Sequence, residues 1–169
     1  IDEVDVFGET MLHAALHFND YHMVTLLIAR KANVDLTNNA GLSPLMLAAM
    51  NLNGEYGSMM DKLLTAKANV NKKNHKGQTP LMHAVYHSNP SMVKKLLSAK
   101  ANVNSTDAKG NTALLLAARN NATSLVKTLL SANANVKVKD KQGKTALYWA
   151  INNGAEDCVK LLRGAGAKE

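Results

Sequence analysis

The sequence predicts an all-α solenoid of stacked helix pairs, and three observations support this prediction. Glycines recur at intervals of 33, 36, 33 and 33 residues, at Gly8, Gly41, Gly77, Gly110 and Gly143. Each glycine is followed two positions later by Thr or Ser, and then by an apolar segment with helical spacing. Each of the first four units also ends in an Ala-Asn-Val tail. A sequence period of this length indicates units that bury their apolar faces against their neighbours.

The first helix of each unit is expected to begin after the recurring Thr or Ser. Its side-chain oxygen can accept hydrogen bonds from free amides, and the proline that follows in Ser43-Pro44 presets φ of the first helical residue. Leu45 is followed three residues later by Ala48, and the same spacing in every unit places large and small apolar groups on one helix face. The predicted starts are Thr10, Ser43, Thr79, Thr112 and Thr145.

A second apolar set predicts a second helix in each unit, after a polar turn. It includes Val24 and Leu27 in the first unit, and Val126 and Leu129 in the fourth. The tail that follows is too short and too rich in turn-forming residues for a third helix, so we expect a tight extended turn. One pair buries only part of its apolar surface, so stability is expected to come mainly from contacts between neighbouring units.

The motif Gly77-Gln78-Thr79-Pro80-Leu81, its 33-residue period and the Ala-Asn-Val-Asn tail resemble the ankyrin repeat. The resemblance covers essentially all 169 residues. It implies L-shaped units, each with two antiparallel helices and a projecting β-turn finger, in a curved array. Such arrays commonly bind proteins with their fingers and with the concave face of the first helices. We expect one domain, residues 1–169, with repeats at about 5–37, 38–73, 74–106, 107–139 and 140–169. Residues 1–4 look like the tail of a preceding repeat, so we expect a piece excised from a larger protein.

The sequence departs from the ankyrin pattern at three kinds of position. Lys31, Lys67, Lys100 and Asn133 stand where the family usually has glycine after the second helix. If the left-handed backbone is kept there, each Lys costs on the order of 1 kcal/mol relative to Gly. The histidine expected after the recurring Leu is present only as His13. Unit two has three extra residues, which we place in a longer loop at residues 51–58 because that segment is polar and glycine-containing.

Composition bounds the cellular setting. The single cysteine excludes an intrachain disulfide, and nothing requires an oxidising compartment. We therefore expect an intracellular location, cytoplasmic or nuclear, or the interior of a host cell if the protein is a secreted effector. The longest apolar runs, such as residues 113–118, are far shorter than the roughly 20 residues that cross a bilayer, so no membrane span is expected.

Two histidine pairs and the cysteine are the candidates for chemistry. His13 with His17, and His83 with His87, have the i, i+4 spacing that can share a metal ion. Alanine follows the first His where a zinc protease carries Glu, and no third ligand suggests itself, so exposed or partly packed histidines are the favoured interpretation. Cys158 is interpreted as a small core residue. With no glycine-rich phosphate loop and no distinct triad, we expect no catalytic residue, no metal site and no cofactor.

One side of the first helices is the better candidate for a functional surface. Residues two, five and six positions after the recurring Leu share that side. If it is the concave side, it presents the aromatic residues Phe18, Tyr86 and Trp149, which are typical binding anchors. Alternatively, Trp149 packs between repeats and Phe18 covers an exposed end. The predicted partner-binding residues here are His17, Phe18, Met50, Asn51, Tyr86, His87, Arg119, Asn120, Trp149, Asn152 and Asn153.

Charge is distributed unevenly along the chain. Residues 1–64 carry 3 basic and 8 acidic groups, whereas residues 65–144 carry 14 basic and 2 acidic groups. Lysines lie in or beside three successive predicted fingers and are included among the partner-binding residues: Lys76, Lys109, Lys141 and Lys144. A basic edge attracts an acidic partner and speeds encounter. The alternative is a role in solubility, because lysines also recur on the second helices at Lys94, Lys127 and Lys160.

The sequence therefore predicts a non-catalytic protein-interaction module whose partner has an acidic surface or segment, with no small-molecule substrate. Two alternatives stay open. The basic segment 65–144 could bind nucleic acid or a phosphorylated ligand, with Tyr86 and Trp149 stacking on bases. The repeats could instead be the targeting module of a larger enzyme or of a bacterial effector.

Overall fold

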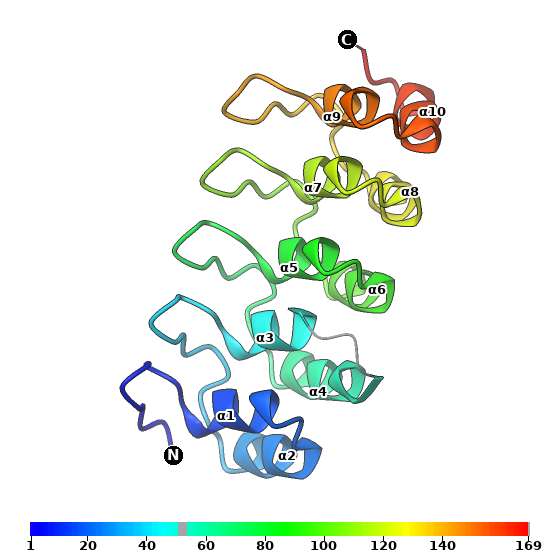
Figure 1. Cartoon of the computed structure of the whole chain (residues 1–169). Coiled ribbons are helices and arrows are strands. Elements are labelled where there is room, and N and C mark those ends of the chain that lie inside the picture. The colour runs from blue at the N-terminus through cyan, green and yellow to red at the C-terminus, as the bar shows by residue number, and fades with distance from the viewer. Residues whose placement is uncertain (51–53, 169) are drawn as a thin grey trace.

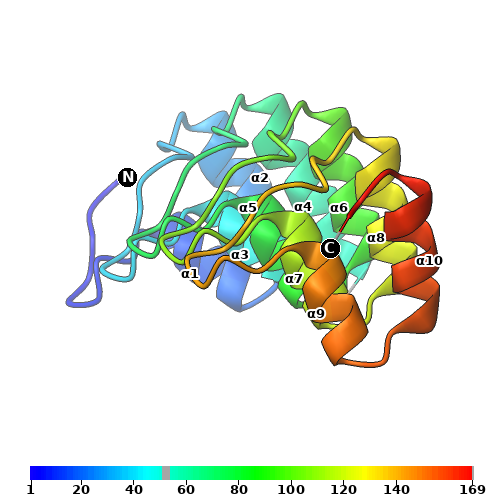
Figure 2. The ribbon, with the colours of Figure 1, turned by 90° about the horizontal axis from the view of Figure 1, so that it is seen from above.

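The computed structural model describes residues 1–50 and 54–168, which contain ten helices arranged as five stacked pairs (Figure 1). The odd-numbered helices, here called the inner helices, lie next to the fingers, and the even-numbered outer helices lie behind them (Figures 1 and 2). This architecture confirms the predicted all-α solenoid. The helices are α1 (Met11–His17), α2 (Tyr21–Ala29), α3 (Pro44–Met50), α4 (Gly54–Thr65), α5 (Pro80–Tyr86), α6 (Pro90–Ser98), α7 (Ala113–Arg119), α8 (Thr123–Ser131), α9 (Ala146–Asn152) and α10 (Glu156–Gly164).

Each inner helix begins where the recurring hydroxyl predicts. The Thr112 side chain, for example, accepts a hydrogen bond from the backbone N–H of Leu115, and Ser43 accepts one from Met46. Pro44 and Pro80 are the first residues of α3 and α5, where the missing N–H costs no helical hydrogen bond. The same threonine cap is present at α1, α5 and α9.

The residues that replace glycine after the outer helices do adopt the left-handed conformation. Lys31, Lys67, Lys100 and Asn133 have φ between 62° and 67°, and Gly166 has φ of 88°. At each of these positions the chain turns out of the helix while its N–H still reaches a helical carbonyl, as Lys100 N–H does with Leu97 at 3.0 Å. The ankyrin-like turn is therefore kept without glycine.

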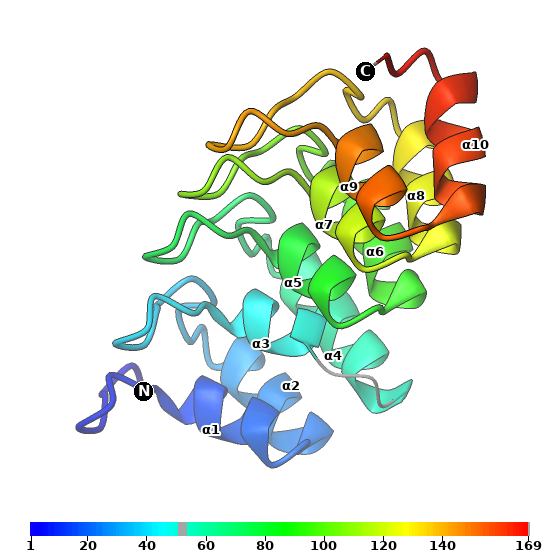
Figure 3. The same ribbon diagram turned by 45° about the horizontal axis from the view of Figure 1, so that its top comes forward.

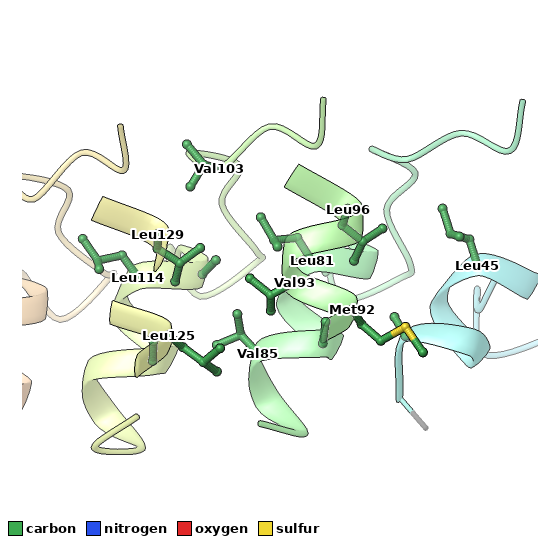
Figure 4. Packing of buried hydrophobic residues seen from close by; sticks show 14 of the residues in the cluster. Leu45, Leu81, Val85, Met92, Val93, Leu96, Val103, Leu114, Leu125 and Leu129 are labelled. Carbon is green, nitrogen blue, oxygen red and sulfur yellow. The ribbon is translucent and has the colours of Figure 1, made fainter. Parts of the chain in front are cut away.

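A continuous core runs through the stack, because buried residues of the inner and outer helices pack between neighbouring units. Leu81 and Val85 of α5 lie close to the side chains of α6 and face those of α7 and α8 (Figure 4). Small residues at the inner-helix positions Ala48, Ala84 and Ala117 are completely buried. Their size lets successive inner helices approach closely, as the Leu and Ala spacing predicts.

Neighbouring tails are joined by a ladder of side chain to backbone hydrogen bonds. In each step an Asp or Asn side chain accepts from the backbone N–H of an Asn in the next tail, at 2.7 to 2.9 Å. Asp2 makes the first step, to Asn33, so residues 1–4 occupy the position that later tails occupy. The remaining acceptors are Asp35, Asn71 and Asn104, and their donors are Asn69, Asn102 and Asn135.

The expected loop at residues 51–58 is wrong in its described part. Residues 51–53 lie outside the described residues, but α4 already begins at Gly54 and is 12 residues long, whereas α2, α6, α8 and α10 have nine. The three extra residues of unit two therefore lengthen a helix. Tyr56 is buried in that added turn, and its hydroxyl donates to the carbonyl of Leu16 at 2.7 Å. Packing of this tyrosine on the preceding unit outweighs the local preference of the nearby glycines.

Candidate functional site

Each finger is stabilised by an Asp or Asn three residues before the recurring glycine, a role that the sequence interpretation missed. One side-chain oxygen accepts from two backbone amides within the finger, as Asn74 does from Lys76 at 2.9 Å and Gln78 at 2.9 Å. The recurring position was the available signal, because such residues commonly stabilise turns in this way. The five residues are Asp5, Asn38, Asn74, Asp107 and Asp140.

Successive fingers are also joined by main-chain hydrogen bonds. The N–H of Ala108 donates to the carbonyl of Lys76 at 2.8 Å, and that of Lys141 donates to the carbonyl of Lys109 at 2.9 Å. The lysine side chains at these positions are exposed. The fingers therefore present Lys76, Lys109 and Lys141 as a row whose backbone spacing is fixed. Lysines of the outer helices are exposed as well, at Lys94, Lys127 and Lys160.

The predicted residues of the inner helices do not share one environment. Tyr86 and Phe18 are 64% and 84% exposed, at or just after the C-terminal ends of α5 and α1. Met50, Arg119 and Trp149 are half-buried, and Asn51 lies outside the described residues. The remaining predicted residues of this face are exposed: His17, His87, Asn120, Asn152 and Asn153.

Trp149 is engaged within the protein. Its indole N–H donates to the carboxylate of Asp140 at 2.8 Å, and the guanidinium carbon of Arg119 lies 4.0 Å from the centroid of its ring. Arg119 also donates to the same carboxylate oxygen at 3.4 Å. Asn153 in turn donates to the carbonyl of Arg119 at 2.7 Å. These contacts connect units four and five, so Trp149 orients Arg119 on this surface.

Asp140 is held as a carboxylate. Burial opposes its ionisation, but hydrogen bonds from the Lys144 N–H, the Trp149 indole and the Gln142 N–H, together with the charge of Arg119, lower its pKa below the ordinary value. The carboxylate therefore stays charged and fully engaged with donors at neutral pH. It balances one of the cations that surround it.

A recess of about 240 Å³ lies between the fourth and fifth fingers, beside this cluster. Three of its lining residues are cationic and one is the already engaged carboxylate, which leaves an excess of positive charge. The recess can therefore accept an anionic group from outside. Its lining residues are Lys109, Asn111, Arg119, Asp140, Lys141 and Gln142.

Lys144 is the exception among the predicted finger lysines. It is half-buried, and its ammonium lies 4.0 Å from the centroid of the Tyr148 ring. Both residues line a different cavity, at the C-terminal end of the stack. Lys144 therefore does not extend the finger row of Lys76, Lys109 and Lys141.

The histidine pairs each combine a buried and an exposed member. His13 is buried and lies within hydrogen-bonding distance of Thr10 and of the Leu42 carbonyl, whereas His17 contacts Glu9 at 3.0 Å. His83 is buried with its Nε2 atom 3.3 Å from the amide nitrogen of Asn74. Among the described residues, no group of three or more His, Cys, Asp or Glu side chains is placed to hold a metal ion.

Cys158 is completely buried, which confirms its interpretation as a core residue. Its sulfur lies 3.4 Å from the Thr123 hydroxyl and 3.6 Å from the side-chain oxygen of Asn121.

In the part of the chain that the structure describes, no helix is long and apolar enough to cross a membrane.

Comparison with known proteins agrees with the geometry of the units. The family model described as ankyrin repeats (3 copies) matches residues 1–74, 45–140 and 89–168, which together span nearly the whole chain. No curated protein matches the chain significantly.

Proposed function

Because the chain belongs to the ankyrin-repeat family, we propose that it is a protein-binding module whose partner presents an acidic surface to the fingers and inner helices of units three to five. Ankyrin-repeat domains are typically non-catalytic binding modules. The observation that carries the proposal is the cationic recess between the fourth and fifth fingers.

The recess suits a carboxylate of the partner. Arg119 is oriented by the Trp149 ring and by Asp140, so little of its side-chain freedom is left to lose when an anion binds. Its guanidinium can form charge-assisted hydrogen bonds with a carboxylate, and the ammonium groups of Lys109 and Lys141 add attraction from the two sides. An Asp or Glu side chain is therefore the group that we expect to enter.

Tyr86 supplies an apolar contact one repeat further along. It is exposed, and its ring packs edge-on against His87 with the centroids 5.3 Å apart. Tyrosine at such a position offers a large contact area with few rotatable bonds and a hydroxyl that can still bond to a partner. A partner that spans units three to five would contact Tyr86 and place an acidic group near Arg119.

The proposal is tested by comparing two charge-reversed variants with equal net charge. In one, the finger residues Lys76, Lys109 and Lys141 are changed to Glu; in the other, the outer-helix residues Lys94, Lys127 and Lys160 are changed to Glu. A fluorescent poly-glutamate peptide serves as the probe. Exposed ion pairs contribute about 0.5 kcal/mol each, so we expect the finger variant to bind the probe at least about tenfold more weakly than the outer-helix variant.

Equal losses in the two variants would show that only net charge matters and would contradict binding at the fingers. A single-stranded oligonucleotide and the poly-glutamate peptide are each titrated at two salt concentrations, because phosphate attraction weakens steeply with salt. Tighter binding of the oligonucleotide than of poly-glutamate would overturn the choice of a protein partner. Affinity capture with the wild-type chain and with Tyr86→Ala/Arg119→Ala in parallel then identifies proteins that need this face.

A further inference from the structure

The cationic recess is lined by two positions that recur in every unit. They are the residue after the recurring glycine and the last residue of the inner helix, here called the paired positions. In unit four they are Asn111 and Arg119, which both line the recess. In unit one they are Glu9 and His17, and the Nε2 atom of His17 lies 3.0 Å from Oε1 of Glu9. The other pairs are Leu42 with Met50, Gln78 with Tyr86, and Lys144 with Asn152.

The chemistry of the paired positions changes along the stack. Unit one offers a carboxylate and an imidazole, unit two offers two apolar side chains, and unit four offers an amide and a guanidinium. Leu42 and Met50 are half-buried, and Tyr86 of unit three is exposed, so both middle units leave apolar surface for a partner. The paired positions of units one to four therefore present an acidic contact, two apolar contacts and a basic contact, in that order.

The acidic contact in unit one is fixed in place. Oε1 of Glu9 accepts from the side-chain nitrogen of Asn38 at 3.1 Å and contacts His17 at 3.0 Å. Burial opposes the ionisation of Glu9, but these hydrogen bonds and the positive charges of His17 and His13 lower its pKa below the ordinary value. Of the contacts that the structure describes, both use Oε1, so Oε2 can accept from a cationic group of a partner.

Charge is segregated in the same sense over the fingers and inner helices. Residues 1–20 and 32–50, which contain these elements in units one and two, include no Lys or Arg. Six of these residues are acidic: Asp2, Glu3, Asp5, Glu9, Asp20 and Asp35. The fingers of units three to five instead carry the exposed lysine row. A uniformly acidic partner is repelled at units one and two, so this pattern favours a partner that is basic there and acidic at the recess.

The spacing of the units matches an extended peptide segment. Successive inner helices pack side by side in order, from α1 to α7 (Figure 3). Packed helices lie about 8 to 10 Å apart. A polyproline II segment has three residues per turn and rises about 3.1 Å per residue, so every third side chain points to the same side about 9 Å further on. Four side chains spaced three residues apart can therefore meet the paired positions of four successive units.

We infer, on the basis of the proposed function, that the partner contributes an extended segment of about ten residues whose two ends carry opposite charges. A Lys or Arg of the segment meets Glu9, and an Asp or Glu at its other end enters the recess at Arg119. Two apolar side chains between them contact Met50 and Tyr86. The order of charges along the segment, and not its net charge, then determines how tightly it binds.

Three labelled peptides of identical composition test this order by fluorescence anisotropy. Each has blocked termini, Leu at its fourth and seventh positions, and Pro and Ser between. Two of them are segregated, with a pair of Lys at one end and a pair of Glu at the other, in the two opposite orders. The third is mixed, with one Lys and one Glu at each end. We expect the tighter segregated peptide to bind at least about fivefold more tightly than the mixed peptide, whereas equal binding would overturn the inference.

Glu9→Gln and Asp157→Asn are matched variants, because each removes one negative charge and keeps one side-chain acceptor oxygen. Glu9→Gln should weaken binding of the segregated peptide by about two- to fivefold. Asp157→Asn, at an exposed carboxylate of the outer helix α10, should leave that binding unchanged. Poly-glutamate should bind Glu9→Gln no more weakly than the wild type. Equal effects of the two variants on the segregated peptide would contradict a contact at Glu9, and circular dichroism verifies that both variants keep their helices.

The poly-glutamate comparison separates this inference from the proposed function. If poly-glutamate binding depends on the finger lysines while the segregated and mixed peptides bind equally, the proposed function stands and the inferred order of charges is wrong. If the wild type binds neither poly-glutamate nor a segregated peptide, the proposed function fails and this inference fails with it. Tighter binding of a segregated peptide with Ala in place of Pro, accompanied by a gain of helix in circular dichroism, would overturn the extended conformation.

Discussion

Acidification should destabilise the repeats through one buried histidine. His83 is 8% exposed, and its Nε2 atom lies 3.3 Å from the amide nitrogen of Asn74, which can only donate a hydrogen bond. The ring therefore accepts this bond in its neutral form. Burial, and then the positive charges of His87 and Lys76, lower the pKa of His83 from 6.5 to about 4.

The sign of the effect follows from the two pKa values. Below pH 6.5 His83 is protonated in the unfolded chain, whereas in the folded chain it stays neutral down to about pH 4. Stability is therefore highest above pH 6.5 and falls as the pH is lowered toward 4. A pKa difference of this size corresponds to about 3 kcal/mol of unfolding free energy.

Urea denaturation followed by circular dichroism at about pH 7 and about pH 4.5 measures this change. His83→Leu is the matched variant, because leucine already occupies the aligned positions Leu47 and Leu116. We expect the variant to lose about 2 to 3 kcal/mol less than the wild type on acidification. His22→Ala, at an exposed histidine of α2, should behave like the wild type. Equal pH dependence in the wild type and His83→Leu would refute the reasoning.

Two further predictions concern the backbone and the Trp149 cluster. Lys100 has φ of 67°, so Lys100→Gly should raise the unfolding free energy measured in urea by about 1 kcal/mol. Lys94→Gly, inside α6, should lower it by a similar amount. A loss of stability in both variants would contradict the left-handed turn at Lys100. Asp140→Asn keeps one acceptor oxygen for the finger amides but replaces the acceptor of the indole N–H. We therefore expect the unfolding free energy to fall by about 1 to 3 kcal/mol and the fluorescence emission of Trp149, the single tryptophan, to change. Unchanged emission would count against this account.

Most of the fold could be predicted because its determinants are local and occur in every unit. A hydroxyl at the start of an inner helix, an apolar pair three residues apart and a turn after the outer helix each act within a few residues. The helix boundaries at Thr10 or Thr112 therefore follow from the sequence. The left-handed turn at Lys31 follows only because the period identifies its position, since lysine alone gives no such indication.

The error in the expected loop arises where a contact between units decides the outcome. Residues 54–58 look like a loop in isolation, but Tyr56 packs against the carbonyl end of α1, and the helix continues. Trp149 is predicted as a partner contact from its place on the helix surface, and the structure adds that a carboxylate of its own finger accepts from its indole N–H. Helical spacing alone could not reveal either contact, because Leu16 lies in the preceding unit and Asp140 lies in the finger before α9.

The positions that set the fold repeat, whereas the positions that distinguish one interface from the next do not. In unit three the finger residue Asn74 reaches His83, and in unit five the corresponding finger residue Asp140 reaches Trp149. The same contact therefore produces a neutral pair in one unit and a carboxylate that attracts Arg119 in another. Within the described contacts, the cationic recess forms beside Asp140 because Arg119 of unit four lies next to the Trp149 ring of unit five. Under the proposed function, binding specificity in this array is encoded by departures from the repeat, and those departures become interpretable once neighbouring units are seen together.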